Sequence, residues 1–223
     1  DTAAQSKARL LILGPHRKRP VRDALEGTIA EKALAMRNYP VLIVQNAVRE
    51  SYRRVLLALD LSDASASAIR AAESLVLGPD ADASIVHAHE PPYQGMLYYA
   101  GVGVDSVARY TDGWEREARR AVRDLLKYES AHFARYDVHI EQQPAAVGIL
   151  RAIERYEPDL VVMGTHGGGR LRRALVGSVA NRVLHETTRD VLIVPEGSFG
   201  LSGSKSVLGA RRPEISRRTA VSG

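Results

Sequence analysis

Short apolar runs alternate with longer amphipathic stretches along most of the chain. Residues 54–60, 83–88, 160–163 and 191–194 are mostly Val, Leu, Ile and Ala, and residues 136–141 alternate apolar with polar side chains. Continuous runs of this kind are typical of parallel strands covered on both faces, and alternation is typical of a half-buried strand. The pattern therefore predicts five strands between residues 53 and 195.

The stretches between these runs carry apolar residues at helical spacing. Helices are expected over residues 62–77, 108–134 and 147–156, and in a stretch that opens at Gly177 and Ser178. The Tyr- and Gly-rich residues 91–106 are expected to form a loop. Strands that alternate with helices predict an α/β fold, an open five-stranded parallel sheet with helices on both faces.

An internal repeat precedes this alternation. Residues 10–44 align without a gap on residues 160–194, at a constant offset of 150. The last four positions are identical in the two copies: Val41, Leu42, Ile43 and Val44 match Val191, Leu192, Ile193 and Val194. Each copy predicts a strand–loop–helix–strand unit. Because one such unit cannot bury a core of its own, we expect the first copy to pack on the central domain or on another chain.

Three regions follow from this organisation. Residues 1–50 are predicted to be the C-terminal fragment of a first domain, and residues 51–196 a complete domain. Residues 197–223 are rich in Gly, Ser and Arg without periodicity, so a disordered basic tail is expected.

Composition excludes several classes of protein. The chain has no cysteine, so it can hold neither a disulfide nor a thiolate-bound metal. No apolar run reaches the roughly 20 residues of a membrane-spanning helix, so no membrane association is expected. Residues 1–7 lack the apolar segment of a secretory signal, and a cytoplasmic location is expected.

The chain is basic, with a formal charge of +5. Much of the excess lies outside the central domain, in Arg17, Lys18, Arg19, Arg22, Arg211, Arg212, Arg217 and Arg218. With two Phe and one Trp, aromatic platforms for bases are scarce. A solvated basic surface is the favoured interpretation, and nucleic acid is not an expected partner.

Residues 164–178, GTHGGGRLRRALVGS, combine features of a phosphate site. They follow a strand and lead into a helix, at the sheet edge where open α/β folds bind ligands. Gly164 and Gly167 let backbone amides approach an anion without a Cβ in the way. Gly177 and Ser178 bring free amides and a hydroxyl to a helix N-terminus, whose dipole favours phosphate.

Other known motifs do not fit. A Walker A loop ends in Gly-Lys-Ser/Thr, which the chain lacks. Gly101 and Gly103 lack the third glycine of a dinucleotide fingerprint. Residues 166–169, HGGG, are similar to an esterase oxyanion motif, but the sequence has no G-x-S-x-G nucleophile elbow. His87 and His89 share a strand face without a third ligand, so no metal site is expected.

The spacing G-x2-G-x9-G-S resembles the ATP-binding signature of the universal stress protein family. Gly164, Gly167, Gly177 and Ser178 fill it. Asp60, with residues 61–65, resembles the family's first strand–helix turn, and residues 86–88 resemble its second strand end. The resemblance spans residues 53–196 and, in part, residues 8–45.

This resemblance implies a strand order of 3-2-1-4-5, with ATP, alone or with Mg²⁺, across the ends of strands 1 and 4. The implied nucleotide contacts are Ala58, Leu59, Asp60, Ala88, Gly164, His166, Gly167, Gly177, Ser178, Val179 and Ala180. It also implies a homodimer through the last strand, residues 191–194, which residues 41–44 could mimic within the chain. In the first copy Arg17 replaces the second glycine, so that copy is expected to be empty.

Two of these roles have a simpler alternative. Asp60 could act only as a helix-capping carboxylate, and His166, which recurs as His16, could serve packing. Arg170, Arg172 and Arg173 are expected to form a solvated face, and Tyr98 and Tyr99 to pack in the loop.

The function favoured by the sequence is that of an ATP-binding regulatory or stress-response protein. The sequence has no positioned general base, Walker-type acid or nucleophile pair, so any ATP hydrolysis is expected to be slow or partner-dependent. The alternative is a nucleotide-free scaffold that dimerises or docks on a partner. A nucleotide hydrolase or transferase would need a second acidic or His residue near Gly164.

Overall fold

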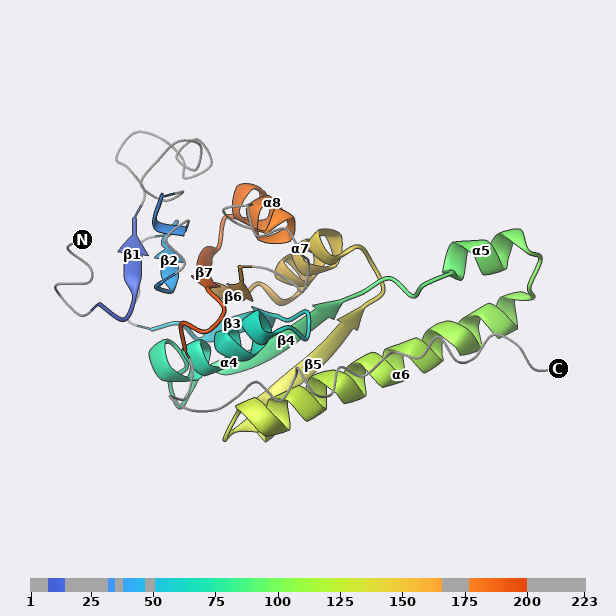
Figure 1. The fold of residues 1–223 in the computed structure, drawn as a ribbon, viewed down its shortest axis with the longest axis horizontal. Helices are drawn as coiled ribbons and strands as arrows, with labels where there is room; N and C mark the ends of the chain where they lie inside the picture. Colours follow the sequence, from blue (N-terminus) through green and yellow to red (C-terminus); the bar gives the residue numbers. More distant parts are fainter. Residues whose placement is uncertain (1–7, 15–31, 35–37, 47–50, 166–176, 200–223) are drawn as a thin grey trace.

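The computed structural model describes residues 8–14, 32–34, 38–46, 51–165 and 177–199 (Figure 1). The strands are β1 (Leu11–Leu13), β2 (Val41–Ile43), β3 (Arg54–Ala58), β4 (Asp82–Ala88), β5 (Tyr136–Glu141), β6 (Leu160–Gly164) and β7 (Asp190–Val194). The helices are α4 (Asp63–Leu75), α5 (Gln94–Tyr99), α6 (Val104–Glu129), α7 (Ala145–Tyr156) and α8 (Ser178–Glu186), with a 3-10 turn η1 (Phe133–Arg135).

All seven strands form one sheet in the order β1-β2-β7-β6-β3-β4-β5. Every neighbouring pair is parallel except β2 and β7. The predicted α/β fold with a mostly parallel sheet is confirmed. The predicted five-stranded sheet is corrected, because β2 and β1 extend it beyond β7. The order 3-2-1-4-5 thus describes only five of the seven strands, in the sequence β5-β4-β3-β6-β7.

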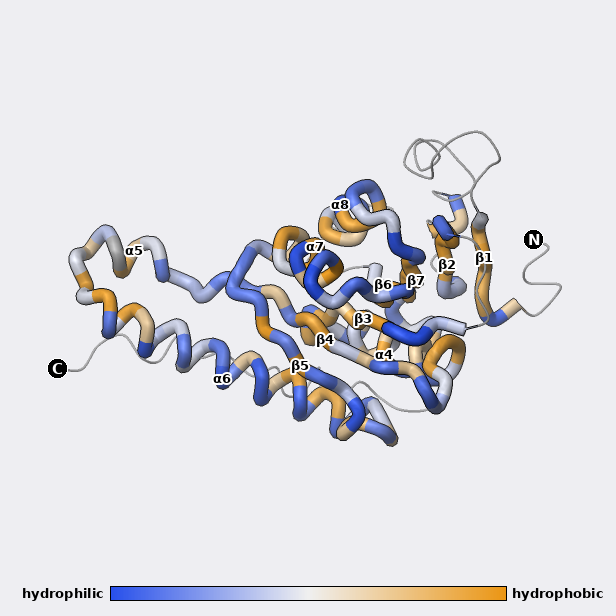
Figure 2. Tube along the Cα trace, turned by 180° about the vertical axis from the view of Figure 1, so that it is seen from behind, coloured by the Kyte–Doolittle hydropathy of each residue, from blue (hydrophilic) through white to orange (hydrophobic). Residues whose placement is uncertain are grey.

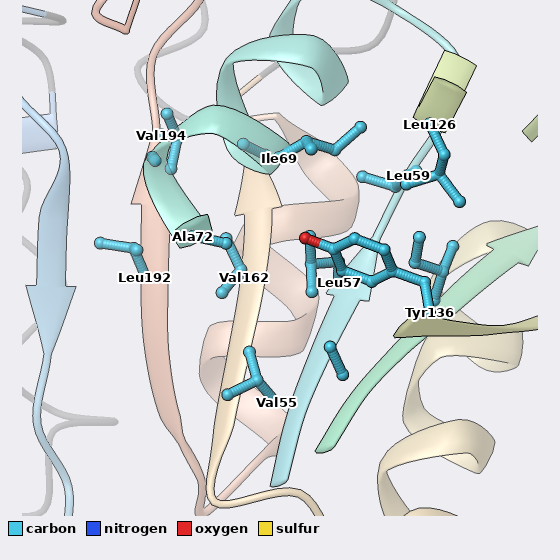
Figure 3. Packing of buried hydrophobic residues seen from close by; sticks show 14 of the residues in the cluster. Val55, Leu57, Leu59, Ile69, Ala72, Leu126, Tyr136, Val162, Leu192 and Val194 are labelled. Atoms are coloured by element: carbon cyan, nitrogen blue, oxygen red, sulfur yellow. The ribbon is translucent and has the colours of Figure 1, made fainter. Parts of the chain in front are cut away.

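Two apolar layers cover the faces of this sheet. On one face, Leu57 and Val162 pack with Ile69 of α4 and Leu126 of α6 (Figure 3). On the other face, alternate strand residues such as Leu56 pack with α7 and α8. Because side chains of a strand point to opposite faces in turn, continuous apolar strands can serve both layers.

The repeat seen in the sequence is also a repeat in space. In β1 and β2, Leu11 lies opposite Val41, and in β6 and β7, Val161 lies opposite Val191, which is the same register at an offset of 150. The antiparallel pairing of β2 with β7 is centred on Leu42 and Leu192. A local two-fold axis through this pair therefore relates β1–β2 to β6–β7. Within the chain, β2 occupies the edge of β7.

The segment that follows β2 is fixed to β7 by a buried carboxylate. Asp190 Oδ1 accepts hydrogen bonds from the backbone N–H groups of Gln45, at 2.7 Å, and Asn46, at 3.0 Å. Asp190 Oδ2 accepts one from the Tyr52 hydroxyl, at 2.9 Å. Burial raises the pKa of Tyr52 far above its usual range, with the Asp190 carboxylate adding to the effect.

The predicted loop over residues 91–106 is wrong in part. It contains α5, and α6 begins at Val104 and ends at Glu129 rather than spanning residues 108–134. Gly103 serves as the N-cap of α6, and Ser130 ends the helix in an extended conformation. Together α5 and the first turns of α6 form an arm that reaches away from the sheet (Figure 1). The expectation that Tyr99 packs in a loop is also wrong, because this residue is 95% exposed on the arm.

None of the helices in the described ranges is both long enough and apolar enough to cross a membrane.

Candidate functional site

The described members of the predicted nucleotide site lie along one edge of the sheet. β3 and β6 are parallel neighbours, with Ala58 opposite Met163, so Asp60, just after β3, and Gly164, the last residue of β6, lie at adjacent strand ends. Ala88 ends β4 on the other side of β3. The other described members belong to the start of α8. His166 and Gly167 lie outside the described residues.

Asp60 organises the turn between β3 and α4. Its Oδ1 accepts hydrogen bonds from the Ser62 N–H, at 3.1 Å, and from the hydroxyls of Ser62 and Ser65, at 2.5 and 2.7 Å. The N-cap of α4 is Ser62, which accepts from the Ser65 N–H, so Asp60 supports the cap rather than forming it. Asp60 is exposed, and no described residue donates to its Oδ2. This oxygen can accept a hydrogen bond from a ligand hydroxyl or amine.

Leu61 carries the backbone strain of this turn. Its φ of 63° lies in the left-handed region that non-glycine residues rarely adopt. The hydrogen bonds that join Asp60 to Ser62 and Ser65 span Leu61 and hold this conformation. Strain of this kind clusters at ligand sites. This strain could not be predicted from the sequence, since leucine is not a turn-forming residue.

Gly164 is required by packing. A Cβ on Gly164 would lie 2.7 Å from the Ala64 Cβ and 3.1 Å from the Ala64 carbonyl carbon. The first turn of α4 therefore lies directly against the end of β6. The sequence interpretation, that glycine lets backbone amides approach an anion, is not needed to explain this residue.

The start of α8 is fixed against the end of β6. The Gly177 N–H donates to the Thr165 carbonyl at 2.8 Å, and the Thr165 N–H donates to the Val194 carbonyl at 3.1 Å. Gly177 is the N-cap, with no side-chain cap, so Ser178 is the first helical residue. The N–H groups of Ser178, Val179 and Ala180 have no acceptor among the described residues, as is usual for a first helical turn without a cap. The backbone of Thr165 makes both of these hydrogen bonds. This role was not predicted from the sequence, because Thr165 belongs to no motif.

Ala88 and Leu59 are less open than the resemblance implied. The Ala88 Cβ lies against α7, where a Cβ on Gly148 would come within 2.6 Å of it. The Leu59 side chain is buried, and its N–H donates to the Val86 carbonyl at 3.0 Å. A ligand can therefore meet these two residues only at the exposed rim of the sheet edge.

His87 and His89 form an aromatic stack beside this edge. Their ring centroids are 5.9 Å apart, and His89 lies 5.5 Å from Trp114 of α6. In the described part of the chain no three His, Asp or Glu side chains are grouped to hold a metal ion. His87 Nδ1 instead bonds the Leu59 carbonyl at 2.8 Å, so His87 supports the strand end that carries Asp60.

Stability is expected to fall in mild acid because of His87. Burial lowers the pKa of this imidazole, against the opposing effect of its hydrogen bond to Leu59. The unfolded chain then binds a proton below the ordinary pKa of 6.5 that the folded chain does not, so stability is complete above that pH and lost as the pH falls. The limiting slope is about 1.4 kcal/mol per pH unit. In urea unfolding between pH 5 and 8, the free energy of unfolding should depend less steeply on pH in His87→Gln than in the unaltered protein. The same decrease in His132→Gln, at an exposed histidine, would contradict this assignment.

The comparisons with known proteins concern the family and the fold. A model of the universal stress protein family matches residues 51–195. Universal stress protein A homolog 1 of Coxiella burnetii is 32% identical over 150 residues, which cover 64% of this chain and 96% of that protein.

Solved structures show the same fold. A putative universal stress protein of Pseudomonas aeruginosa UCBPP-PA14 superposes with a TM-score of 0.57 at 22% identity, over 89% of this chain and 67% of that chain. A universal stress protein of Archaeoglobus fulgidus DSM 4304 gives a TM-score of 0.58 at 21% identity, over 87% of this chain and 63% of that chain. The chain thus spans about two thirds of the length of these two structures. On the family match and the shared fold, the chain belongs to the universal stress protein family.

Proposed function

We propose that the chain binds ATP at the carboxyl edge of β3 and β6 and acts as a nucleotide-occupied regulatory protein. The observation that carries the proposal is the hydrogen bond between Gly177 and Thr165. It holds the start of α8 beside the end of β6, the strand adjacent to β3, and three amides there have no acceptor among the described residues.

The parts of this edge suit different parts of a nucleotide. The amides of Ser178, Val179 and Ala180, with the Ser178 hydroxyl, are donors at the positive end of a helix dipole and suit phosphate oxygens. Asp60 Oδ2, to which none of the described residues donates, is an acceptor and suits a ribose hydroxyl or a base amine. Ala88 would border the base. Mg²⁺ would arrive with the triphosphate.

Slow hydrolysis, if any, is part of the proposal. Asp60 Oδ1 is engaged by three donors in its own turn. At this edge the described residues include no carboxylate–histidine or nucleophile–base pair that could activate water. The nucleotide would therefore stay bound without being hydrolysed, and a partner could recognise the nucleotide-bound form of the protein.

The test is whether the purified protein retains nucleotide. Mass spectrometry after denaturation is expected to detect ATP or ADP, and Gly177→Val combined with Ser178→Ala is expected to weaken ATP binding about 100-fold or more, because a branched side chain and a lost hydroxyl alter the phosphate contacts. Titration calorimetry gives the affinity, and thermal unfolding with and without ATP gives a second measure.

The chain offers a matched control. Gly103 caps α6 with φ −57° and ψ 144°, close to the φ −58° and ψ 147° of Gly177, and also has no side-chain cap. Gly103→Val therefore makes the same change at a helix start on the arm and should leave ATP binding intact. A nucleotide-free protein whose melting temperature ATP does not raise would favour the scaffold alternative.

A further inference from the structure

The peptide unit between Leu59 and Asp60 is held at both of its polar groups by side chains of other elements. The Leu59 carbonyl accepts a hydrogen bond from His87 Nδ1 of β4 at 2.8 Å. The Asp60 N–H donates to the Ser65 hydroxyl of α4, also at 2.8 Å. Both side chains are buried beside the hydrophobic strands β3 and β4 (Figure 2), where a polar group needs a hydrogen-bond partner. A strand and a helix thus fix the one peptide plane that leads into Asp60.

His87 replaces a backbone donor at the end of the ladder between β3 and β4. Ala58 lies opposite Val86, so Leu59 would pair with His87 if the ladder continued. The Leu59 N–H still donates to the Val86 carbonyl at 3.0 Å, as in a parallel ladder. Its carbonyl accepts instead from the His87 side chain. The backbone can therefore leave the sheet toward α4 at this point while the Leu59 carbonyl remains bonded.

The direction of each hydrogen bond follows from the chemistry of its partners. A carbonyl oxygen can only accept, so His87 carries a hydrogen on Nδ1. The Ser65 hydroxyl accepts from the Asp60 N–H and donates to Asp60 Oδ1 at 2.7 Å. Oδ1 therefore faces the turn, and Oδ2 is the carboxylate oxygen to which no described residue donates.

We propose that His87 and Ser65 are positioning residues for the nucleotide. By holding both ends of this peptide unit, they set the direction in which Asp60 Oδ2 meets a ribose hydroxyl or a base amine. A carboxylate that is fixed before binding loses less conformational entropy when the ligand arrives, which favours affinity. Without the hydrogen bond from His87, the peptide unit can change its orientation, so Oδ2 meets the ligand less often in the right direction. The inference rests on the proposed function and extends it to two residues that do not contact the ligand.

Two substitutions of His87 separate this hydrogen bond from packing. His87→Asn keeps an N–H donor near the position of Nδ1 but removes the ring that stacks on His89, whose centroid lies 5.9 Å away. His87→Phe keeps a ring at this position but has no donor. In titration calorimetry of the full 223-residue protein with ATP, His87→Phe is expected to weaken binding about tenfold and His87→Asn by less than about threefold. A role in packing alone would give the reverse order.

His185 provides the matched control. Its Nδ1 also bonds a backbone carbonyl at 2.8 Å, that of Asn181, in the last turn of α8. His185→Phe therefore removes the same kind of hydrogen bond at a distance from Asp60 and should leave ATP binding unchanged. Ser65→Ala removes the second anchor of the peptide unit and should weaken binding about as much as His87→Phe.

A double variant tests whether His87 acts through Asp60. Asp60→Asn replaces Oδ2 by an NH2 group, because the donors around Oδ1 keep the remaining oxygen there. In this background His87→Phe should weaken ATP binding by much less than in the unaltered protein, since the positioned acceptor is already gone.

Equal losses in the two backgrounds would overturn the inference. Equal ATP binding by His87→Phe and the unaltered protein would also overturn it, as would weaker binding by His87→Asn than by His87→Phe. In each of these cases the unaltered protein still binds ATP, so the proposed function stands. If the unaltered protein binds no ATP, the proposed function itself fails, and the positioning role falls with it.

Discussion

Asp190→Ala is expected to lower the free energy of unfolding by about 2–3 kcal/mol, because a buried charged acceptor loses its hydrogen bonds, whereas its donors are partly or fully exposed and can bond to water. The donors are the backbone N–H groups of Gln45 and Asn46, the side-chain amide of Asn46 and the hydroxyl of Tyr52. Tyr52→Phe removes only one of these bonds and should cost about 1 kcal/mol. Urea unfolding followed by circular dichroism measures both losses.

The same variant tests whether residues 45–52 hold the first repeat on the sheet. In Asp190→Ala, hydrogen exchange should accelerate first at β2, which lies between β1 and β7. Asp82→Ala is the control, because Asp82 also begins a strand but is exposed, and it should change stability by less than about 0.5 kcal/mol. Equal losses in the Asp190 and Asp82 variants would show that the hydrogen bonds of Asp190 are not what fixes this segment.

Gly164→Ala is expected to cost about 2–3 kcal/mol through overpacking, whether or not ATP is present. The added Cβ would meet the Ala64 Cβ at 2.7 Å and the Ala64 backbone at 3.1 and 3.2 Å. Ala64→Gly in the same chain removes the closest contact and should restore part of the loss, since the backbone contacts remain. Denaturant unfolding of the two single variants and the double variant gives the coupling between the sites.

Gly14→Ala is the matched control in the other copy of the repeat, and its stability should equal that of the unaltered protein because a Cβ there meets no atom of the described residues within 4 Å. The series also guides nucleotide experiments. Loss of ATP binding in Gly164→Ala would accompany loss of packing, so it would not by itself locate the phosphate. If the Gly164→Ala protein kept its stability but no longer bound ATP, Gly164 would be needed for contact with the ligand and not for packing.

The sequence by itself determined the repeated unit and the positions of most strands. Apolar runs at residues 54–60 and 191–194 became β3 and β7, because a strand covered on both faces leaves a continuous local signal. The alternating residues 136–141 became β5, at one edge of the sheet. The constant offset of 150 also predicted two equivalent strand pairs, and the register repeats it. The glycine spacing indicated the edge of the sheet at which nucleotide binding should be tested.

Only the tertiary structure decided which contacts these residues make. That β2 joins the sheet antiparallel, that Gly164 is needed by Ala64, and that Asp190 holds the segment after β2 all depend on residues far apart in the chain. The left-handed Leu61 and the helix α5 were likewise unmarked by composition. Periodicity records which face of an element is buried, but it does not record what covers that face, because the partner is chosen by packing across the whole fold.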